Sequence, residues 1–192
     1  MTMTLFIFFL SLMLTEPAVS HGQELPGPAE WERADLTTTR LPPTAFASLP
    51  GALQSELHRR GCTVPQTYDG GPPHNVIQGR FLNASKTDWA VLCSRNRRSL
   101  ILVFWEGVAT NVSELAEQPD SSYLQVTFHQ TIGFSRKLGV ATPQQIREQH
   151  RIFGCPKPPP LDHDGVEDAF LDKASVVWYR HGSQWLQLTG AD

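Results

Sequence analysis

The sequence predicts a β-dominated α+β fold, in which hairpins form one or more antiparallel sheets and two to three helices flank them. The main observation is a pair of short apolar runs, Trp89–Cys93 and Leu100–Trp105, on either side of the polar, basic segment Ser94–Ser99. Neither run contains glycine or proline, and both include β-branched or aromatic residues, which is typical of adjacent strands joined by a tight connection. Because the apolar residues are consecutive in both runs, we expect both faces of this central hairpin to be covered.

Further strands are predicted on both sides of the central hairpin. The segment Asn75–Leu82 leads into it, and Tyr123–Phe128 alternates apolar and polar residues, as a half-exposed strand does. Ile132–Val140 predicts a weaker strand, because glycines interrupt it. Ala174–Tyr179 and Gln184–Leu188 are separated by a His-Gly-Ser segment and predict a terminal hairpin.

Two amphipathic patterns predict helices, and one further segment predicts a shorter helix. Ser48–Arg60 has a capping serine, a proline in its first turn and leucines at helical spacing on one face. Thr142–Phe153 begins with a capping box that has proline at the first helical position, and Ile146 and Ile152–Phe153 form its apolar stripe. Asn111–Gln118 predicts one or two helical turns that end at a proline.

The length and composition fit one folded domain with less ordered ends. The chain has 192 residues, of which 40% are hydrophobic and 18% are charged, so wholesale disorder is not expected. The formal net charge of -3 and the pI near 6.1 provide no electrostatic footprint for nucleic acid. A compact basic cluster, Arg95, Arg97 and Arg98, falls in the turn of the central hairpin. We expect this cluster to be solvated, with docking of an acidic partner as the alternative.

Residues 1–20 have the organisation of a cleavable export signal. Leu5–Leu14 is a short apolar segment, Pro17 breaks it, and small residues precede a cleavage site after Ser20. The segment MTMT at the start carries no Lys or Arg, and an uncleaved anchor is therefore the alternative. About ten apolar residues are too few to span a bilayer, which needs roughly twenty. We therefore expect an exported protein, periplasmic or secreted, with no membrane span after cleavage.

The remainder of the chain is predicted to have two parts. Residues 21–44 are rich in proline and threonine and predict a flexible leader, whereas residues 45–192 predict a single β-rich globular domain. Within that domain, the proline-rich segment Cys155–Pro160 predicts a stiff polyproline-like connector, because proline is excluded from helix interiors and inner strands.

The chain has three cysteines, and export would permit them to form a disulfide. We expect Cys62 and Cys93 to pair, which would stabilise the fold by roughly 3–4 kcal/mol for a loop of that length. Pairing of Cys93 with Cys155 is the alternative. One thiol is left over in either case, and an isolated cysteine is usually a buried, small apolar side chain rather than a nucleophile.

Two loop segments have related sequences. Gly79–Val91 reads GRFLNASKTDWAV and Leu161–Leu171 reads LDHDGVEDAFL, and each is followed by strands rich in aromatic residues. The spacing of Gly79, Phe81 and Asp88 resembles the FG-GAP repeat of β-propeller proteins. The resemblance implies two diverged copies of one loop-plus-strand unit. Because a propeller typically needs at least four blades, these copies would form incomplete propeller-like units within a smaller sheet domain.

In the FG-GAP family the loop carboxylates bind calcium, which makes the second copy the candidate metal site. The resemblance implies Asp162, Asp164 and Asp168 as calcium ligands, completed by a carbonyl oxygen and waters, because calcium takes six to eight oxygen ligands. The first copy lacks oxygen ligands at the matching positions, and no calcium is expected there. The alternative for the second copy is an Asx-Gly turn whose carboxylates cap backbone N–H groups.

The sequence lacks the residue patterns that carry the common catalytic chemistries. It contains no G-x-S-x-G elbow, H-E-x-x-H helix or C-x-x-C pair. His163 lies between Asp162 and Asp164, and neighbouring carboxylates could hold its imidazole for acid–base chemistry. Across residues 62–192, the chain also resembles exported bacterial proteins with no assigned activity, which supports export and implies no chemistry.

We therefore expect an exported, non-catalytic β-rich domain with a binding or structural role. Its predicted partner is an envelope or extracellular protein or a glycan, with a weak calcium loop as a further expectation. A small secreted hydrolase that uses His163 with the neighbouring aspartates is the alternative.

Overall fold

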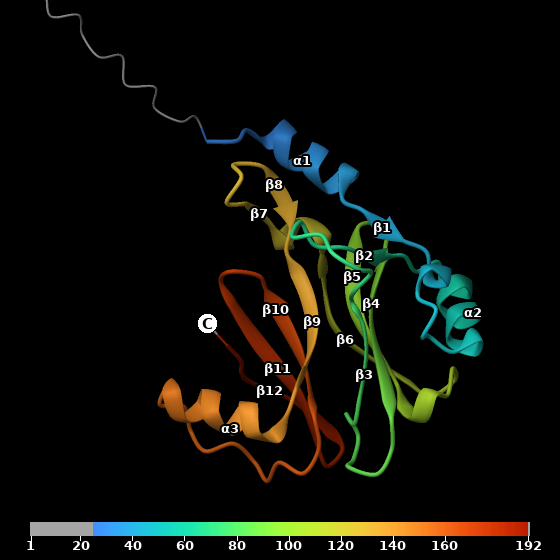
Figure 1. Cartoon of the computed structure of the whole chain (residues 1–192), viewed down its shortest axis with the longest axis vertical. Helices are drawn as coiled ribbons and strands as arrows, with labels where there is room; N and C mark the ends of the chain where they lie inside the picture. Colours follow the sequence, from blue (N-terminus) through green and yellow to red (C-terminus); the bar gives the residue numbers. More distant parts are fainter. Residues whose placement is uncertain (1–24, 192) are drawn as a thin grey trace, which may run out of the picture.

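Two antiparallel sheets pack face to face in this chain, and one helix covers the outer face of each sheet (Figure 1). The computed structural model describes residues 25–191 and confirms the predicted β-dominated α+β fold. The expected export signal, its cleavage site at Ser20 and the first residues of the predicted leader lie outside the described part. Within residues 25–191, no helix is both long enough and apolar enough to cross a membrane.

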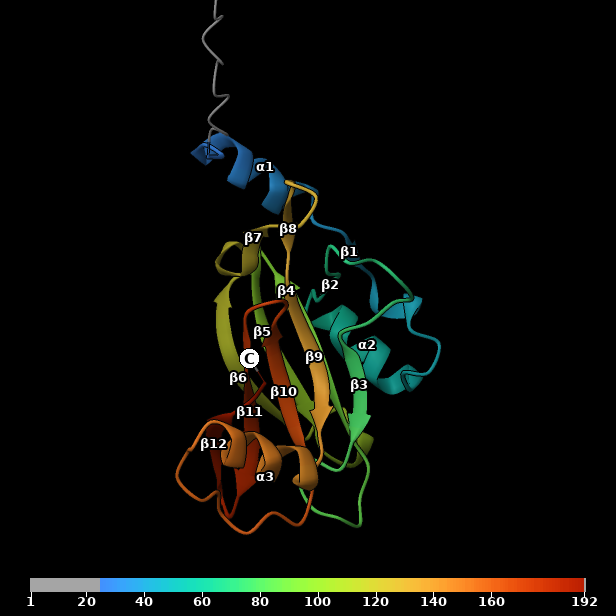
Figure 2. The same ribbon diagram turned by 60° about the vertical axis from the view of Figure 1, so that its left-hand side comes forward.

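Each of the two main sheets has four strands, which pair with their neighbours along the chain (Figures 1 and 2). The first sheet has the order β3-β4-β5-β6, with β3 at Val76–Gly79, β4 at Asp88–Arg95, β5 at Arg98–Phe104 and β6 at Val112–Pro119. The second sheet has the order β12-β11-β10-β9, with β9 at Arg136–Ala141, β10 at Gly165–Phe170, β11 at Ala174–His181 and β12 at Gln184–Thr189. The strands predicted at the end of the chain are therefore confirmed as the β11–β12 hairpin.

The remaining elements lie around these sheets. Two short strand pairs are β1 (Arg40–Leu41) with β2 (Val64–Pro65), and β7 (Leu124–Val126) with β8 (Ile132–Phe134). The α-helices are α1 (Pro28–Thr37), α2 (Gly51–Arg59) and α3 (Pro143–Ile152), and the 3-10 helices are η1 (Pro43–Ala45), η2 (Trp105–Gly107) and η3 (Asp120–Tyr123).

The central hairpin is confirmed, and both of its faces are covered as expected. The strands β4 and β5 join through Asn96 and Arg97, whose φ angles of 52° and 58° form the left-handed turn that matches the twist of paired strands. On β4, Val91 packs toward α2, whereas Leu92 packs toward the second sheet. A strand that is buried on both faces needs consecutive apolar residues, which explains the unbroken apolar runs.

The predicted disulfide is also confirmed. Cys62 follows α2 and bonds to Cys93 on β4, so the bond ties the end of this helix to the middle of the first sheet. Cys155 is the free cysteine of the described chain. Leu53 and Leu57 of α2 are fully buried against the same sheet, as the leucine spacing predicts.

The prediction of a helix over Asn111–Gln118 is wrong, because this segment forms strand β6. Good helix formers such as Glu114, Leu115 and Ala116 favour helix locally. In the fold, however, β6 pairs with β5 in antiparallel register, with Leu115 opposite Ile101. Tertiary pairing thus overrides local propensity, since the open edge of β5 gains a ladder of backbone hydrogen bonds that a single bulge between Ser99 and Ile101 interrupts.

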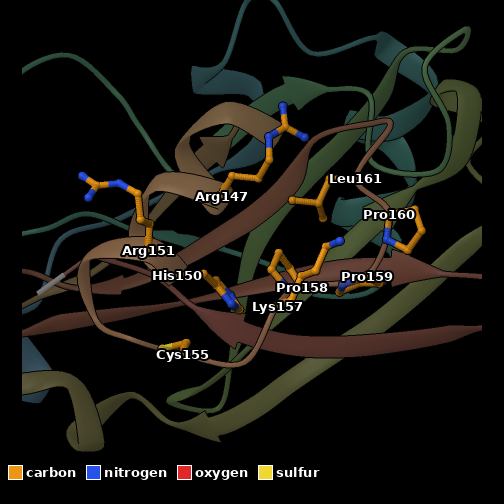
Figure 3. Close-up of a pocket in the computed structure, with 9 residues that line it drawn as sticks. All are labelled: Arg147, His150, Arg151, Cys155, Lys157, Pro158, Pro159, Pro160 and Leu161. Atoms are coloured by element: carbon orange, nitrogen blue, oxygen red, sulfur yellow. The ribbon is translucent and has the colours of Figure 1, made fainter.

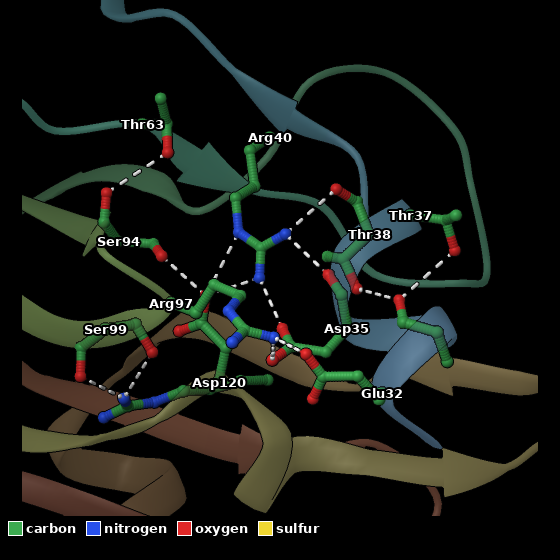
Figure 4. A network of polar contacts seen from close by, with 12 residues as sticks. Glu32, Asp35, Thr37, Thr38, Arg40, Thr63, Ser94, Arg97, Ser99 and Asp120 are labelled. Atoms are coloured by element: carbon green, nitrogen blue, oxygen red, sulfur yellow. Dashed lines mark hydrogen bonds and ion pairs between the residues drawn. The ribbon is translucent and has the colours of Figure 1, made fainter. Parts of the chain in front are cut away.

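The prediction of a flexible leader over residues 21–44 needs correction as well, because residues 28–37 form helix α1. A buried ion network holds this helix in place (Figure 4). The guanidinium group of Arg40 lies 2.7 Å from Asp35 at the end of α1 and 2.7 Å from the fully buried Asp120, which also accepts a hydrogen bond from Ser94. Two buried carboxylates share this cation, and Asp35 also pairs with Arg97 at 3.2 Å, so loss of Arg40 would leave the charge of Asp120 uncompensated.

A second buried ion pair lies within the second sheet, and further hydrogen bonds of its arginine reach the first sheet. Arg136 on β9 is completely buried and donates to both carboxylate oxygens of Asp168 on β10, each at 2.8 Å. Its remaining N–H groups donate to Ser99 on β5 and to the carbonyl oxygen of Ala116 on β6. The guanidinium group therefore crosses the space between the sheets, and its ion pair and hydrogen bonds set how they pack together.

Candidate functional site

The three carboxylates predicted to bind calcium have separate surroundings and do not gather around a common point. Asp168 is paired with Arg136, and Asp164 accepts the backbone N–H of Arg80 at 3.0 Å. The side chain of Asp162 is 81% exposed. Among the described residues, no group of three or more His, Cys, Asp or Glu side chains is placed to hold a metal ion. The structure therefore does not bring the three predicted calcium ligands together, since burial and pairing commit two of these carboxylates to the fold.

His163 is buried, and its ring is fully engaged. The imidazole stacks on Tyr179 with ring centroids 4.4 Å apart. Its Nδ1 lies 2.9 Å from the carbonyl oxygen of Asp164, and its Nε2 lies 2.9 Å from the carbonyl oxygen of Arg180. Both ring nitrogens thus face backbone acceptors, an arrangement that fixes the segment entering β10.

Asp88, in the first of the two related loop segments, is engaged by backbone donors. Its buried carboxylate accepts backbone N–H groups of Phe81, Leu82 and Glu106 at 2.8–2.9 Å. A carboxylate with three backbone donors needs no cation to balance its burial. This aspartate therefore closes the β3–β4 loop.

The strongest candidate site is a groove of about 810 Å³ between α3 and the proline-rich segment that follows it. We call residues 155–161 the proline strap, and the cavity between the strap and α3 the α3 groove. Its volume lies within the roughly 300–1,000 Å³ that is typical of small-molecule sites. The residues that line it are Arg147, His150 and Arg151 of α3, and Cys155, Lys157, Pro158, Pro159, Pro160 and Leu161 of the strap (Figure 3).

The amino-acid sequence builds this groove in a few local steps. Thr142 caps α3, because its side chain accepts the N–H of Gln145 while the Gln145 side chain accepts the N–H of Thr142. The helix ends at Gly154, whose φ of 65° turns the chain back on itself. The predicted capping box is therefore confirmed. The predicted apolar stripe is confirmed only in part, because Ile146 is buried whereas Ile152, at the end of the helix, is 56% exposed.

The strap is held at both ends. At its start, the N–H of Cys155 donates to the carbonyl oxygen of His150 at 3.0 Å. At its far end, the Tyr179 hydroxyl lies 3.2 Å from the carbonyl oxygen of Pro160 and accepts the N–H of Asp162. Burial raises the pKa of the Tyr179 hydroxyl, the backbone N–H of Asp162 lowers it and the Asp162 carboxylate raises it; the net shift is upward, so the hydroxyl keeps its proton. Since the four prolines between these ends restrict the backbone, the groove is preformed.

His150 presents an unpaired nitrogen at the groove. The residue is 8% exposed, and its Nδ1 lies 2.8 Å from the carbonyl oxygen of Pro156. A carbonyl can only accept, so Nδ1 carries the proton of that hydrogen bond. Nε2 is buried and has no hydrogen-bond partner in the described structure. Figure 3 shows the ring between the helix and the strap.

The charges around the groove are positive. Arg147, His150 and Arg151 have the spacing that places side chains on one helix face. Arg151 pairs with Glu148 at 2.6 Å, whereas neither Arg147 nor Lys157 has an ion-pair partner within the part of the chain that the structure describes. Figure 3 shows the two arginines extending outward from α3, and Lys157 lines the groove from the strap.

The strap supplies the apolar part of the lining and a thiol. Pro158, Pro159 and Leu161 form an apolar wall, and Cys155 lies at the end near the helix turn. The Cys155 thiol donates to the hydroxyl of Thr189 on β12 at 3.2 Å. The groove thus combines an apolar wall, a cationic rim and a buried imidazole, which together suit an anion that carries an apolar body.

No family model matches the sequence, and neither a curated protein nor a solved structure matches the chain. The FG-GAP resemblance therefore stays a prediction. The sequence pattern alone does not identify the residues that line the α3 groove as a site. The available signal was the basic i, i+3, i+4 face of α3 followed directly by a proline-rich segment, but that pattern does not show that the two segments face each other.

Proposed function

We propose that this chain is an exported, non-catalytic binding protein whose α3 groove takes up a small organic anion with an apolar body. The observation that carries the proposal is the buried, unpaired Nε2 of His150 in the groove. A buried polar atom without a partner costs about 1–3 kcal/mol. A ligand that supplies the missing partner recovers this cost, and because Nδ1 carries the proton of the neutral ring, Nε2 accepts a hydrogen bond from a donor group of the ligand.

The groove charges support an anion over a cation or a neutral ligand. Arg147 and Lys157 are free of carboxylate partners among the described residues, so their charge is available to a ligand. Cations that line a groove with low-dielectric walls raise the local concentration of anions. The wall formed by Pro158, Pro159 and Leu161 would cover the apolar body.

The predictions from the sequence enter this proposal as follows. Export and a binding role are retained, and the groove adds a ligand class to them. A protein or glycan partner stays a prediction. No observation favours the alternative hydrolase, because both ring nitrogens of His163 already face backbone carbonyl oxygens and its Nε2 is 3.7 Å from the exposed Asp162.

A matched pair of fluorescent probes tests the proposal. 8-Anilinonaphthalene-1-sulfonate (ANS) is an aromatic anion, and N-phenyl-1-naphthylamine has the same aromatic body without the sulfonate. We expect ANS to bind the folded chain with a single saturable site and at least about tenfold more tightly than the neutral probe at low salt. The difference should shrink at high salt, because ions screen exposed charges.

Charge-reversal variants locate the probe. The double variant Arg147→Glu with Lys157→Glu should lose about tenfold in ANS affinity while its affinity for the neutral probe stays within about twofold. Arg33→Glu is the matched control, because Arg33 is exposed on α1, at the end of the molecule away from α3 (Figure 1). Equal binding of both probes, or an equal loss in the control variant, would contradict the proposal.

A further inference from the structure

The third cysteine of the chain has no partner for a disulfide within the described structure. Cys62 and Cys93 are bonded to each other, and Cys155 remains free. In an oxidising compartment, a cysteine left over in this way either pairs with another molecule or stays a reactive thiol. The question is which molecule the surroundings of Cys155 select.

The position of Cys155 makes it part of the α3 groove. Its side chain is partly exposed, and its thiol is oriented by the hydrogen bond to Thr189. The same groove contains the buried His150, whose Nε2 has no partner. A thiol and an unpaired buried imidazole thus line one cavity, and the imidazole is an independent sign that the cavity receives a polar ligand.

The groove charges select the partner of the thiol. A disulfide between two copies of this chain would bring two cationic rims together, each with Arg147, Arg151 and Lys157. Like charges at short range repel, which disfavours that dimer. An anionic small molecule meets the opposite situation, because the same cations attract it toward Cys155.

We propose that Cys155 is a modification site that forms a mixed disulfide with a small anionic disulfide drawn into the α3 groove; this inference rests on the proposed anion-binding role of the groove. The thiol first loses its proton to solvent. The thiolate then attacks one sulfur of the disulfide, so that a new S–S bond forms at Cys155 while the old S–S bond breaks. The departing thiolate takes up a proton, and the disulfide is the oxidant in the exchange.

Three disulfides with similar short bodies test the charge selection. 3,3′-Dithiodipropionate is anionic, 2-hydroxyethyl disulfide is neutral and cystamine is cationic. Mass spectrometry of the folded chain gives the rate of adduct formation, peptide mapping locates the adduct, and Cys155→Ser shows the background. Each rate is divided by the rate for N-acetylcysteine methylamide, because the three leaving thiols differ in intrinsic reactivity.

We expect the normalised rate for the anionic disulfide to exceed that for the cationic one by about tenfold at low salt, and this ratio to approach one at 1 M salt. The variant Arg147→Glu with Lys157→Glu should reverse the order, whereas Arg33→Glu should keep it. The salt series uses the native chain, so the test does not depend on a variant that folds.

The outcomes separate this inference from the binding role. An absence of adduct at Cys155, equal normalised rates for the three disulfides, or a Cys155-linked dimer as the main product would overturn the modification site, even if ANS binds as expected. If the anionic disulfide reacts faster than the cationic one at low salt and this difference disappears at 1 M salt, the modification site is supported, even if the ANS comparison fails.

Discussion

The buried guanidinium group of Arg136 allows the sharpest prediction about the fold that carries the groove. In the variant Arg136→Met, an apolar side chain of similar length replaces the cation, and the Asp168 carboxylate stays buried without its partner. The native side chain makes two charge-assisted hydrogen bonds to Asp168 and three to Ser99 and Ala116, all at 2.8–3.1 Å.

Removing one partner of a fully buried ion pair typically costs about 3–5 kcal/mol, because the remaining charge is uncompensated. For a chain of this size each kcal/mol lowers the melting temperature by roughly 2–4 °C, so the variant should melt about 6–20 °C below the native chain. Urea denaturation followed by tryptophan fluorescence measures the free energy of unfolding directly.

Two controls make this prediction refutable. Arg98→Met removes an ion pair with Glu117 in which both side chains are about half exposed, and it should cost less than about 1 kcal/mol. The double variant Arg136→Met with Asp168→Leu should be more stable than Arg136→Met alone, since no buried charge is left unpaired. A cost below about 1 kcal/mol for Arg136→Met, or a double variant less stable than the single one, would refute the reasoning.

Three further changes have outcomes that follow from single contacts. Tyr179→Phe removes the hydroxyl that holds the end of the strap, so it should lower the free energy of unfolding by about 1–2 kcal/mol. The freed strap should also bind ANS more weakly and exchange the Asp162 N–H faster. Replacing Cys62 and Cys93 by serine should cost roughly 3–4 kcal/mol in urea denaturation, because the bond closes a loop across a sequence separation of 31. Hydrogen bonds from two neighbouring arginines lower the pKa of Glu56 from 4.5 to about 2, so the carboxylate stabilises the fold above pH 4.5 and this contribution is lost as the pH falls toward 2. The native chain should therefore be more stable than Glu56→Gln above pH 4.5, and the difference in denaturation midpoints should vanish near pH 2.

Each of these three predictions can be contradicted by its own measurement. Unchanged exchange at Asp162 in Tyr179→Phe would show that the hydroxyl does not hold the strap. Equal midpoints with and without the disulfide would remove its role in joining α2 to β4. A constant difference between the native chain and Glu56→Gln from pH 2 to pH 7 would contradict the lowered pKa.

The elements that the sequence predicted correctly are those whose cause is local or strongly patterned. The β4–β5 hairpin follows from consecutive apolar residues, and the start of α3 follows from the capping box at Thr142 and Gln145. The pairing of Cys62 with Cys93 agrees with the position of one cysteine after a helix and the other on the central strand.

The elements that were missed depend on contacts between distant segments. Helix α1 is held through Arg40 by Asp120, which lies 80 residues further along the chain. Strand β6 exists because β5 offers an open edge, although its own residues favour helix. The α3 groove requires Gly154 to turn the strap back under the helix and Tyr179 to hold it there. The predicted calcium ligands do not meet at one point in the structure, because Arg136, far away in sequence, pairs with Asp168.

The measurement that tests the central claim most directly is an NMR titration of the histidine side chains with ANS. Nε2 of His150 is the unpaired nitrogen in the groove, whereas both ring nitrogens of His163 lie 2.9 Å from backbone carbonyl oxygens, so His163 serves as an internal reference. We expect the His150 imidazole resonances to shift in a saturable manner while those of His163 stay in place. Unmoved His150 resonances at saturating ANS would contradict a binding site in the α3 groove.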